Sequence, residues 1–119
     1  EAIEELMTED YCITTAGVLI EGRTNFKNWV AGFQNILLEA ENKIEDIFYN
    51  EAQNKVVARW ICRGKNNGLF GLPGDDKIIS FSGIAIWTVR DGRLSECWVE
   101  RSAYELYQSL KSEGESKFV

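Results

Sequence analysis

Residues 78–101 constrain the fold of this chain more than any other stretch, because two long apolar runs are joined there by a tight turn. The first run is IISFSGIAIWTV, the turn is Arg90-Asp91-Gly92-Arg93, and the second run is LSECWVER. An Asp-Gly pair between runs rich in Ile, Val and Trp predicts an antiparallel hairpin, since glycine tolerates a positive φ in the turn. Both runs are longer than an average strand, which indicates the central ribbon of a curved sheet.

The first run of the hairpin divides its apolar side chains into two sets, because successive residues of a strand point to opposite faces. The sets are Phe81, Gly83, Ala85, Trp87 and Val89 on one face, and Ile84 and Ile86 on the other. We therefore expect both faces to be covered, one by helices and the other by a second sheet or a subunit. The small residues Gly83 and Ala85 would let the sheet bend or a helix approach closely.

The segments before the hairpin predict an amphipathic helix between shorter elements. Residues 11–15 predict a short strand, and residues 16–23 a loop or short strand. The clearest helix has Thr24 or Asn25 as its N-cap and repeats apolar residues at the 3.6-residue period as far as Ala40. Its apolar stripe must face the sheet.

The rest of the chain predicts strands and a closing helix. Residues 43–50 and 55–63 alternate as strands on either side of a turn. Residues 64–76 hold four glycines and the only proline, so they predict an irregular crossing. Ser102-Ala103-Tyr104-Glu105 predicts a capping box that opens the closing helix, and residues 112–119 have the composition of a frayed tail.

Length and composition predict one domain, residues 1–119, with a single core, because 45% of the 119 residues are hydrophobic. Residues 1–8 have helical composition, and since the pattern is already under way at Glu1 we expect this first helix to be truncated at its start. The net charge of -6 disfavours nucleic acids and anionic membranes as partners. No apolar run approaches the roughly 18 residues of a membrane span, and no leader pattern is present, so we expect a soluble, cytoplasmic protein.

The three cysteines, Cys12, Cys62 and Cys97, each lie within or beside an apolar strand-like run. This placement favours reduced, partly buried thiols over a disulfide, and no Cys-x-x-Cys spacing suggests a metal. The sequence has no histidine, which removes the commonest zinc ligand and the commonest general base near neutral pH. We expect no metal site, and any acid–base chemistry must use carboxylates, tyrosine, cysteine or water.

Four segments, in a consistent order along most of the chain, carry a family resemblance. They are Glu9-Asp10-Tyr11, Glu21-Gly22-Arg23, Val57-Ala58-Arg59-Trp60 with Gly64 and Gly68-Leu69-Phe70-Gly71, and Asp91-Gly92-Arg93-Leu94-Ser95-Glu96-Cys97-Trp98 running to Tyr107-Gln108-Ser109-Leu110. With the order of predicted elements, this set resembles the SnoaL-like polyketide cyclase branch of the nuclear transport factor 2-like superfamily. The resemblance implies an α+β, cone-shaped (cystatin-like) fold, in which a curved antiparallel or mixed sheet wraps around N-terminal helices.

The resemblance also implies a homodimer packed through the outer face of the sheet and a deep apolar pocket inside the cone. It implies cofactor-free, aldol-type ring closure, in which a carboxylate removes an activated proton and hydrogen-bond donors hold the enolate. This chain departs from the family pattern at two positions. Asn66 stands where the family has a histidine after the tryptophan-bearing strand, and Ser102 stands where it has an aspartate four residues past the last-strand tryptophan.

Two carboxylates are candidates for a substitute base. Glu96 and Glu100 share a strand face with Trp98. A carboxylate beside a tryptophan in a pocket can have a raised pKa suited to proton abstraction. The alternative is that Glu96 pairs across strands with Arg59 and that Glu100 lies at the rim.

Other polar candidates have structural alternatives. Ser102 has no base nearby in the sequence and would fit the first position of a capping box. Asn66 would donate to a ligand carbonyl, but Asn-Asn-Gly in a loop is also turn chemistry. Tyr11 and Tyr104 would supply a phenol to an enolate, or would be buried with the hydroxyl pointing outward.

Large aromatic residues from four segments suit a pocket for a flat apolar ligand, because the cone fold would bring them together. With three polar or phenolic neighbours they make the predicted ligand pocket of Tyr11, Trp29, Phe33, Trp60, Asn66, Phe70, Trp98 and Ser102. Three functions remain open. The chain is a cyclase or isomerase acting on a polyketide- or terpenoid-like compound with Glu100 or Glu96 as base, a non-catalytic binding module for the same ligands, or a structural dimer whose aromatics fill its own interior.

Overall fold

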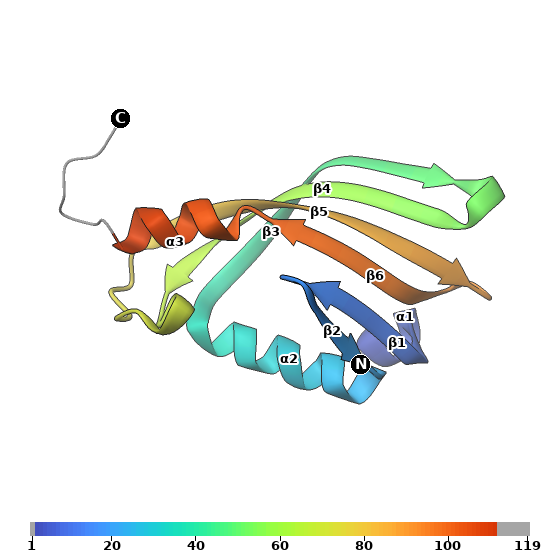
Figure 1. Ribbon diagram of the computed structural model, residues 1–119, viewed down its shortest axis with the longest axis horizontal. Coiled ribbons are helices and arrows are strands. Elements are labelled where there is room, and N and C mark those ends of the chain that lie inside the picture. Colours follow the sequence, from blue (N-terminus) through green and yellow to red (C-terminus); the bar gives the residue numbers. More distant parts are fainter. Residues whose placement is uncertain (1, 112–119) are drawn as a thin grey trace.

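A computed structural model describes residues 2–111, which form one curved sheet with helices on its inner side and at its end (Figure 1). The elements in chain order are α1 (Ala2–Leu6), β1 (Met7–Thr15), β2 (Val18–Glu21), α2 (Arg23–Ile36), β3 (Leu37–Asn50), the 3-10 turn η1 (Glu51–Gln53), β4 (Lys55–Asn66), the 3-10 turn η2 (Leu69–Gly71), β5 (Ile78–Arg90), β6 (Arg93–Arg101) and α3 (Ala103–Lys111). The tail predicted at residues 112–119 and the start of the first predicted helix lie outside the described residues.

The hairpin predicted from residues 78–101 is confirmed and forms the middle of the sheet. Strands β5 and β6 pair antiparallel, and Asp91 and Gly92 have φ angles of 54° and 78°. Positive φ at both central residues is the geometry of a two-residue hairpin turn that matches the strand twist. The sheet has six strands in the order β2-β1-β6-β5-β4-β3, with β1 parallel to β6, so the predicted α+β fold with a mixed sheet is confirmed.

Helix α2 lies along the concave, inner face of the sheet, and α3 packs near the N-terminal end of β5 (Figure 1). Two clusters of buried side chains result, one under the N-terminal half of α2 and one near its C-terminal end. Their buried members are Tyr11, Ile13, Phe26, Ala85, Cys97 and Val99 in the first, and Leu37, Cys62, Leu69, Ile79, Phe81 and Leu106 in the second. The partly buried Trp60 packs against both clusters, which makes its indole the link between them.

Helix α2 ends earlier than the sequence predicts. The apolar period continues to Ala40, but the helix stops at Ile36 and residues 37–50 form β3. Leu37 is only 1% exposed and packs so closely on Gly64 that a Cβ there would stand 2.8 Å from Leu37 Cγ. Burial of Leu37 against β4 therefore overrides the local helical pattern.

The start of α2 also differs from the prediction. The helix begins at Arg23, and its N-cap is Gly22 rather than Thr24 or Asn25. Gly22 has a φ of 91°, which side-chain-bearing residues rarely adopt. The side-chain amide of Asn25 donates to the carbonyl of Glu21 at 2.9 Å, so Asn25 braces the first turn from inside the helix.

The first strand is longer, and the first helix shorter, than the sequence predicts. Helix α1 ends at Leu6, and β1 runs from Met7 rather than from Tyr11. The added residues reach β6 through Met7, which pairs with Leu94, whereas β2 pairs only from Cys12 onward. Of the described residues 2–8, only Ala2–Leu6 are therefore helical.

Gly83 allows a close approach, as predicted, but the group that approaches is an indole rather than a helix. A Cβ at Gly83 would stand 2.6 Å from Cζ2 of Trp60. On the opposite face of the same strand, Ile84 and Ile86 remain 49% and 42% exposed. Among residues 2–111, nothing covers these two side chains on the outer face of the sheet.

The closing helix is present, but Ser102 does not act as predicted. Ser102 Oγ accepts a hydrogen bond from the backbone N–H of Ser82 at 3.0 Å, while the Ser102 carbonyl accepts from Leu106 N at 3.2 Å. The hydroxyl thus ties the start of α3 to β5 instead of forming a capping box with Glu105.

The cysteines are free thiols, as predicted, with Cys62 and Cys97 buried and Cys12 partly exposed. Among residues 2–111, no group of three or more His, Cys, Asp or Glu side chains is placed to hold a metal ion. No helix in the described part of the chain is long and apolar enough to cross a membrane.

Candidate functional site

The principal candidate site is a cavity between α2 and the inner face of the sheet, which we call the inner cavity. Its volume is about 410 Å³, within the usual range for small-molecule sites. The wall is mostly apolar and aromatic. It is lined by Trp29, Val30, Phe33, Gln34, Ala40, Asn42, Ile44, Trp60, Cys62, Phe81, Trp87 and Arg101.

One wall of the inner cavity is a row of aromatic rings on α2. Trp29 and Phe33 stack with their ring centres 5.6 Å apart and their planes 6° from parallel. Phe26 continues the row, 6.3 Å from Trp29. These spacings follow from positions three and four residues apart on one helix face. A continuous flat aromatic surface therefore faces the sheet.

The opposite wall is built on β4 and β5. The Trp60 indole lies over Gly83, and its ring centre is 6.4 Å from that of Trp87. Phe81 on β5 lies edge-on to Phe33 of α2, with the ring centres 6.3 Å apart. The two walls thus meet through Phe81 and Phe33, which closes one side of the cavity.

The inner cavity opens beside β3, the edge strand of the sheet. The lining residues from this strand, Ala40, Asn42 and Ile44, are exposed, whereas Cys62 and Phe81 are buried in the wall. Asn42 and the exposed Gln34 would meet an entering ligand first. The site therefore has a polar mouth and an aromatic interior.

Arg101 brings a positive charge to the wall of the inner cavity. Its Nη1 donates a hydrogen bond to Thr15 Oγ1, and its guanidinium carbon lies 5.3 Å from the centre of the Trp29 ring. Within residues 2–111, no carboxylate forms an ion pair with this guanidinium. Burial lowers the pKa of Arg101. The nearby thiols of Cys97 and Cys62 have the opposite, smaller effect on this pKa.

These thiols are neutral at physiological pH. Burial raises the pKa of Cys97 to about 11, and burial likewise raises the pKa of Cys62. Burial also raises the pKa of the nearby Tyr11 phenol. The charge on Arg101 is thus not balanced by these groups.

The structure brings three of the predicted pocket residues together in the inner cavity: Trp29, Phe33 and Trp60. Tyr11 lies next to the cavity in the first core cluster, 1% exposed, with its ring edge-on to Phe26 at 4.9 Å. It therefore packs against the Phe26 end of the aromatic row and does not line the cavity.

Asn66 lies outside the inner cavity, and its polar atoms organise the loop after β4. Its Oδ1 accepts from the backbone N–H groups of Gly68 and Leu69, at 3.2 and 3.0 Å. Its Nδ2 donates to the Pro73 carbonyl and to Asp75 Oδ1, at 3.2 and 3.0 Å. Since Asn66 is 1% exposed and its side chain makes four hydrogen bonds, the turn alternative describes its role.

Two predicted pocket aromatics lie on the surface, away from the inner cavity. Phe70 is 45% exposed and edge-on to Tyr107 of α3, with ring centres 5.4 Å apart. Trp98 is 54% exposed on the outer face of the sheet, where it pairs with Ile86. Tyr104 is 66% exposed.

Glu96 and Glu100 lie on the same outer face as Trp98. Glu100 Oε2 accepts from Trp98 Nε1 at 2.7 Å, and Glu96 Oε1 accepts from Thr88 Oγ1 at 3.4 Å. Arg59 pairs with Asp46 at 2.7 Å instead of with Glu96. As general bases, these two glutamates would need a substrate on the outer face, because the sheet separates them from the inner cavity.

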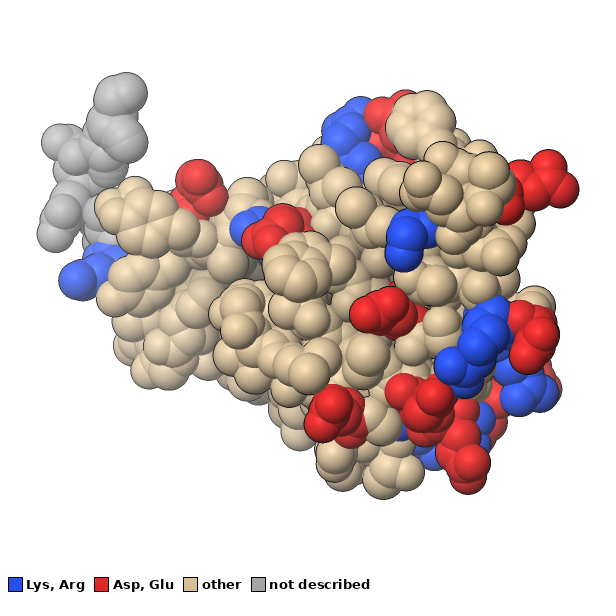
Figure 2. Space-filling view, turned by 45° about the vertical axis from the view of Figure 1, so that its right-hand side comes forward, with Lys and Arg blue, Asp and Glu red and all other residues tan. Residues whose placement is uncertain are grey.

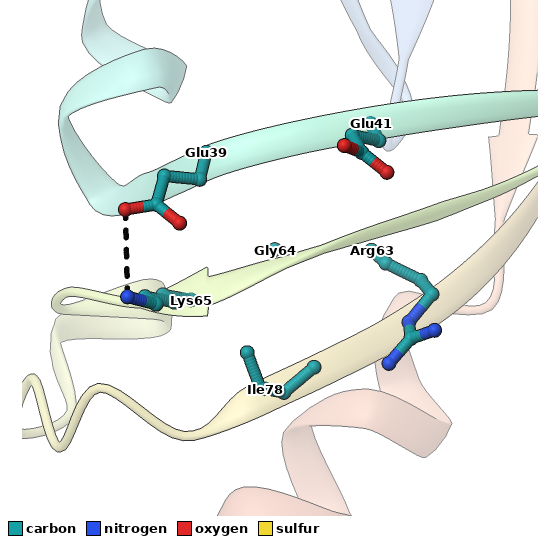
Figure 3. Close-up of a pocket in the computed structure, with 6 residues that line it drawn as sticks. All are labelled: Glu39, Glu41, Arg63, Gly64, Lys65 and Ile78. Atoms are coloured by element: carbon teal, nitrogen blue, oxygen red, sulfur yellow. Dashed lines mark hydrogen bonds and ion pairs between the residues drawn. The ribbon is translucent and has the colours of Figure 1, made fainter.

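Two smaller hollows are polar and open. One, of about 270 Å³, lies at the ends of β3, β4 and β5, where Lys65 Nζ is 3.4 Å from Glu39 Oε2 and Arg63 extends from β4 (Figure 3). The other is lined by Glu9, Asp10 and Arg90. Each is lined mainly by charged side chains and holds one surface ion pair, so neither has the apolar wall of the inner cavity.

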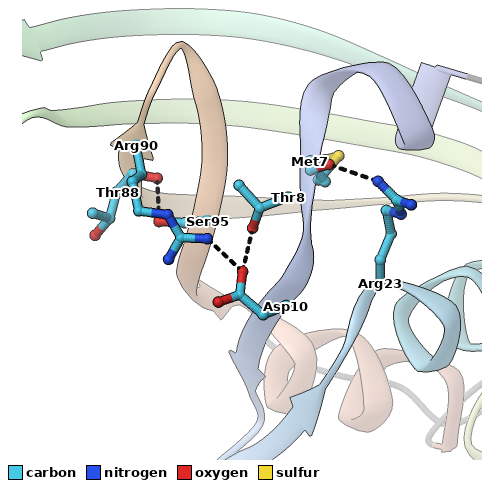
Figure 4. A network of polar contacts seen from close by, with 7 residues as sticks. All are labelled: Met7, Thr8, Asp10, Arg23, Thr88, Arg90 and Ser95. Atoms are coloured by element: carbon cyan, nitrogen blue, oxygen red, sulfur yellow. Dashed lines mark hydrogen bonds and ion pairs between the residues drawn. The ribbon is translucent and has the colours of Figure 1, made fainter.

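The Asp10 hollow belongs to a polar network that joins β1 to the tip of the central hairpin (Figure 4). Asp10 Oδ1 accepts from Arg90 Nη2 and from Thr8 Oγ1, each at 2.7 Å. The Arg90 hydrogen bond lowers the pKa of Asp10 to about 2. Nearby, Arg23 Nη1 donates to the Met7 carbonyl at 3.1 Å, which ties the start of α2 to β1. These contacts hold β1 against its neighbours, so the network has a structural role that needs no ligand.

The sequence interpretation missed Arg101, Trp87 and the polar mouth residues Gln34 and Asn42. Trp87 was placed on the same face as Gly83, so strand alternation contained the signal for its place in the wall. Arg101 is a single basic residue at the end of a strand, and nothing in the local pattern separates it from a solvated charge.

Comparisons with known proteins place the fold. A model of the SnoaL-like domain family matches residues 1–97. Among solved structures, the chain is similar to a proposed SnoaL-like polyketide cyclase from Jannaschia sp. CCS1, with 16% identity, a TM-score of 0.84, and 92% of this chain and 76% of that chain covered. It is similar to a proposed polyketide cyclase from Bacillus cereus ATCC 10987, with 29% identity, a TM-score of 0.73, and 92% and 67% covered.

A third similar structure is that of AclR, a proposed hydroxylase from Streptomyces galilaeus, with 14% identity, a TM-score of 0.77, and 91% of this chain and 80% of that chain covered. Functionally curated proteins gave no significant match. Since proposed cyclases and a proposed hydroxylase share this fold, the fold alone does not decide a reaction.

Proposed function

The chain belongs to the SnoaL-like domain family of the nuclear transport factor 2-like superfamily, and from this membership we propose that it binds an apolar, polyketide- or terpenoid-like small molecule in the inner cavity. The observation that carries the proposal is the pair of facing aromatic walls, with Trp29 and Phe33 on one side and Trp60 and Trp87 on the other. Flat apolar ligands gain most from such walls, because burial removes their faces from water and stacks them on rings.

The distribution of tryptophans gives a direct test. The chain has four, and three of them, Trp29, Trp60 and Trp87, line the inner cavity, while Trp98 lies on the outer face. A planar neutral probe, 2-acetylnaphthalene, is expected to quench tryptophan fluorescence in the Trp98→Phe variant as strongly as in the unaltered protein. Saturable quenching that depends on Trp98 alone, or no quenching at all, would count against the inner cavity as the site.

Two versions of the function differ in their chemistry. In the first, the chain is a cofactor-free cyclase or isomerase with Glu100 or Glu96 as the base, and its substrate must then reach the outer face of the sheet, where both side chains lie. In the second, it binds the same class of ligand without turnover. The second is favoured by one observation, which is that none of the described residues lining the inner cavity is a carboxylate or a histidine.

The Glu96→Gln/Glu100→Gln double variant separates the two versions. Ligand affinity at the inner cavity should be unchanged in either case, because both side chains lie on the outer face. Turnover that disappears in the double variant supports the cyclase or isomerase. A bound compound that is retained through purification and released unaltered, as measured by native mass spectrometry, supports the binding module.

We also propose that two copies of the chain pack through the outer face of the sheet. One row across this face, formed by paired positions on four strands, is Phe48, Val57, Ile86 and Trp98. Phe48, Ile86 and Trp98 are 65%, 42% and 54% exposed. Figure 2 shows charged side chains gathered on the right of the molecule and fewer of them scattered among uncharged residues elsewhere. A contiguous apolar row of this length is unusual on a monomer, since it leaves large side chains in water.

A further inference from the structure

We propose that the inner cavity takes an aromatic carboxylate, whose ionised carboxyl group binds Arg101 while the ring system lies between the aromatic walls. This inference rests on the proposed function, because it names the chemical class of the ligand for the same cavity.

The position of Arg101 is set by a row of paired residues across the inner face. Ile44 pairs with Trp60, Trp60 with Gly83, and Gly83 with Arg101. Ile44 stands at the exposed mouth on β3, and Arg101 is three strands further in on β6. At the usual strand spacing the row is roughly 14 Å long. The cavity that Ile44, Trp60 and Arg101 line has a volume of about 410 Å³, which is enough for a fused-ring compound.

The guanidinium has hydrogen-bonding capacity that the described residues leave unused. Arginine carries five N–H donors, and the side-chain hydrogen bond formed by Arg101 among residues 2–111 is the one from Nη1 to Thr15. Although Asp and Glu outnumber Lys and Arg by 19 to 13 in this chain, no described carboxylate is placed against Arg101. A positive charge set into an apolar wall is costly unless an anion meets it.

The environment favours a planar anion of single charge. Parallel N–H groups of a guanidinium match the two oxygens of a carboxylate, and such charge-assisted pairs are about twice as strong as neutral ones. A phosphate would bring up to two charges against one cation among apolar side chains. Asn42 and Gln34 are neutral and lie toward the mouth, so they would not balance the second charge.

The aromatic groups around Arg101 fix where the ring system would lie. Trp29 stacks on Phe33 and also lies 5.3 Å under the guanidinium, so one flat surface runs from the charge toward the mouth. The Trp60 indole faces this surface across the cavity. A ligand with its carboxylate on Arg101 would thus place its rings between Trp29 and Trp60.

The test compares two isosteric probes by isothermal titration calorimetry at pH 7: 2-naphthoate, which is ionised, and 2-naphthamide, which is neutral. The unaltered protein should bind the acid roughly tenfold to a hundredfold more tightly than the amide, as expected for a hydrogen-bonded charge in a partly buried site. In Arg101→Met, the acid should lose this advantage, so that the acid and the amide bind within about twofold of each other.

Arg101→Lys is the matched variant that keeps the charge but removes the fork of donors. It should retain part of the preference for the acid. Because the comparison of acid with amide in the unaltered protein needs no substitution, the proposal stays testable even if a variant fails to fold.

The outcomes separate this inference from the proposed function. If the amide binds the unaltered protein as tightly as the acid, the cavity binds apolar ligands but Arg101 does not select carboxylates, and the inference is wrong. An acid preference that persists in Arg101→Met also overturns it. If neither probe nor 2-acetylnaphthalene binds, the proposed function fails, and the inference fails with it.

Discussion

The indole of Trp60 lies so close over Gly83 that a Cβ at residue 83 would stand 2.6 Å from Trp60 Cζ2 and 2.9 Å from Cε2. Gly83→Ala must therefore move the indole, and the free space into which it can move is the inner cavity. We expect a loss of about 1–3 kcal/mol in the free energy of unfolding, the usual cost of overpacking. Probe binding should weaken as well, because the displaced ring occupies the ligand's place.

Gly32→Ala is the matched control for this prediction. Gly32 is exposed within α2, and a Cβ there would meet nothing within 4 Å. Alanine should stabilise the helix by about 0.5–1 kcal/mol. Urea unfolding followed by tryptophan emission measures both variants. Equal stability changes of the same sign in the two variants would show that the contact between Trp60 and Gly83 does not limit the fold.

Most of the sheet could be predicted from the sequence, because alternation and the Asp-Gly turn are local signals. The exit of α2 could not. Leu37 and Ala40 continue the helical period, and only the partner strand β4 decides that Leu37 is buried by strand pairing instead. Likewise, Gly22 rather than a polar side chain starts α2, since the backbone must turn there with a φ of 91°.

The candidate site was predictable only in part. Which residues were predicted correctly depends on the face of the sheet to which each side chain points. Trp60 shares a face with Cys62 and points inward, whereas Trp98 pairs with Ile86 on the outer face. The sequence interpretation grouped both tryptophans by residue type, which carries no information on the face. The role of Arg101 could not be predicted. What distinguishes this residue is that no described carboxylate pairs with it, and only the tertiary structure shows which side chains surround it.

The ion pair between Arg90 and Asp10 predicts a particular dependence of stability on pH. The Arg90 hydrogen bond lowers the pKa of Asp10 from 3.8 to about 2. A lowered pKa in the folded state stabilises the protein above the ordinary pKa, and this contribution is lost as the pH falls from about 4 through about 2. Asp10→Asn keeps the acceptor for Thr8 but removes the charge. Its free energy of unfolding should therefore be lower than that of the unaltered protein at pH 6, and the two values should converge near pH 2.

Unfolding curves recorded at several pH values check this convergence, and they should be repeated at high salt. The pair is exposed, so salt should shrink the difference at pH 6. A difference that stays constant from pH 6 to pH 2 would mean that Asp10 acts through its shape and not through its charge.

The outer row of apolar residues predicts how the proposed dimer can be broken. Ile86 lies in the middle of the row, between Val57 and Trp98, and is 42% exposed in one chain. Ile86→Glu would bury a carboxylate in the dimer interface but leave it hydrated in the monomer, so it should weaken dimerisation by tenfold or more, a change of about 1.4 kcal/mol or more. Asn28→Glu, on the exposed side of α2, is the control.

Native mass spectrometry and sedimentation at several concentrations would measure this effect. We expect dimers of the unaltered protein and of Asn28→Glu, and monomers of Ile86→Glu with unchanged probe binding. A protein that is monomeric before any substitution, or an Ile86→Glu variant that remains as dimeric as the control, would contradict packing through this face.

The three thiols should differ in reactivity because their burial differs. Burial raises the pKa of Cys97 to about 11 from an ordinary value of 9.0, so at pH 8 its thiolate fraction is roughly a hundredfold lower, and the thiolate is the reactive form. Cys62 is buried in the cavity wall, whereas Cys12 is partly exposed. Labelling with Ellman's reagent should therefore show one fast thiol, which Cys12→Ser removes, and two that react only as the fold opens. Labelling of Cys97 at the rate of a free thiol would contradict its burial under α2.

Bound 2-acetylnaphthalene should slow the labelling of Cys62 further, because ligand binding stabilises the folded state.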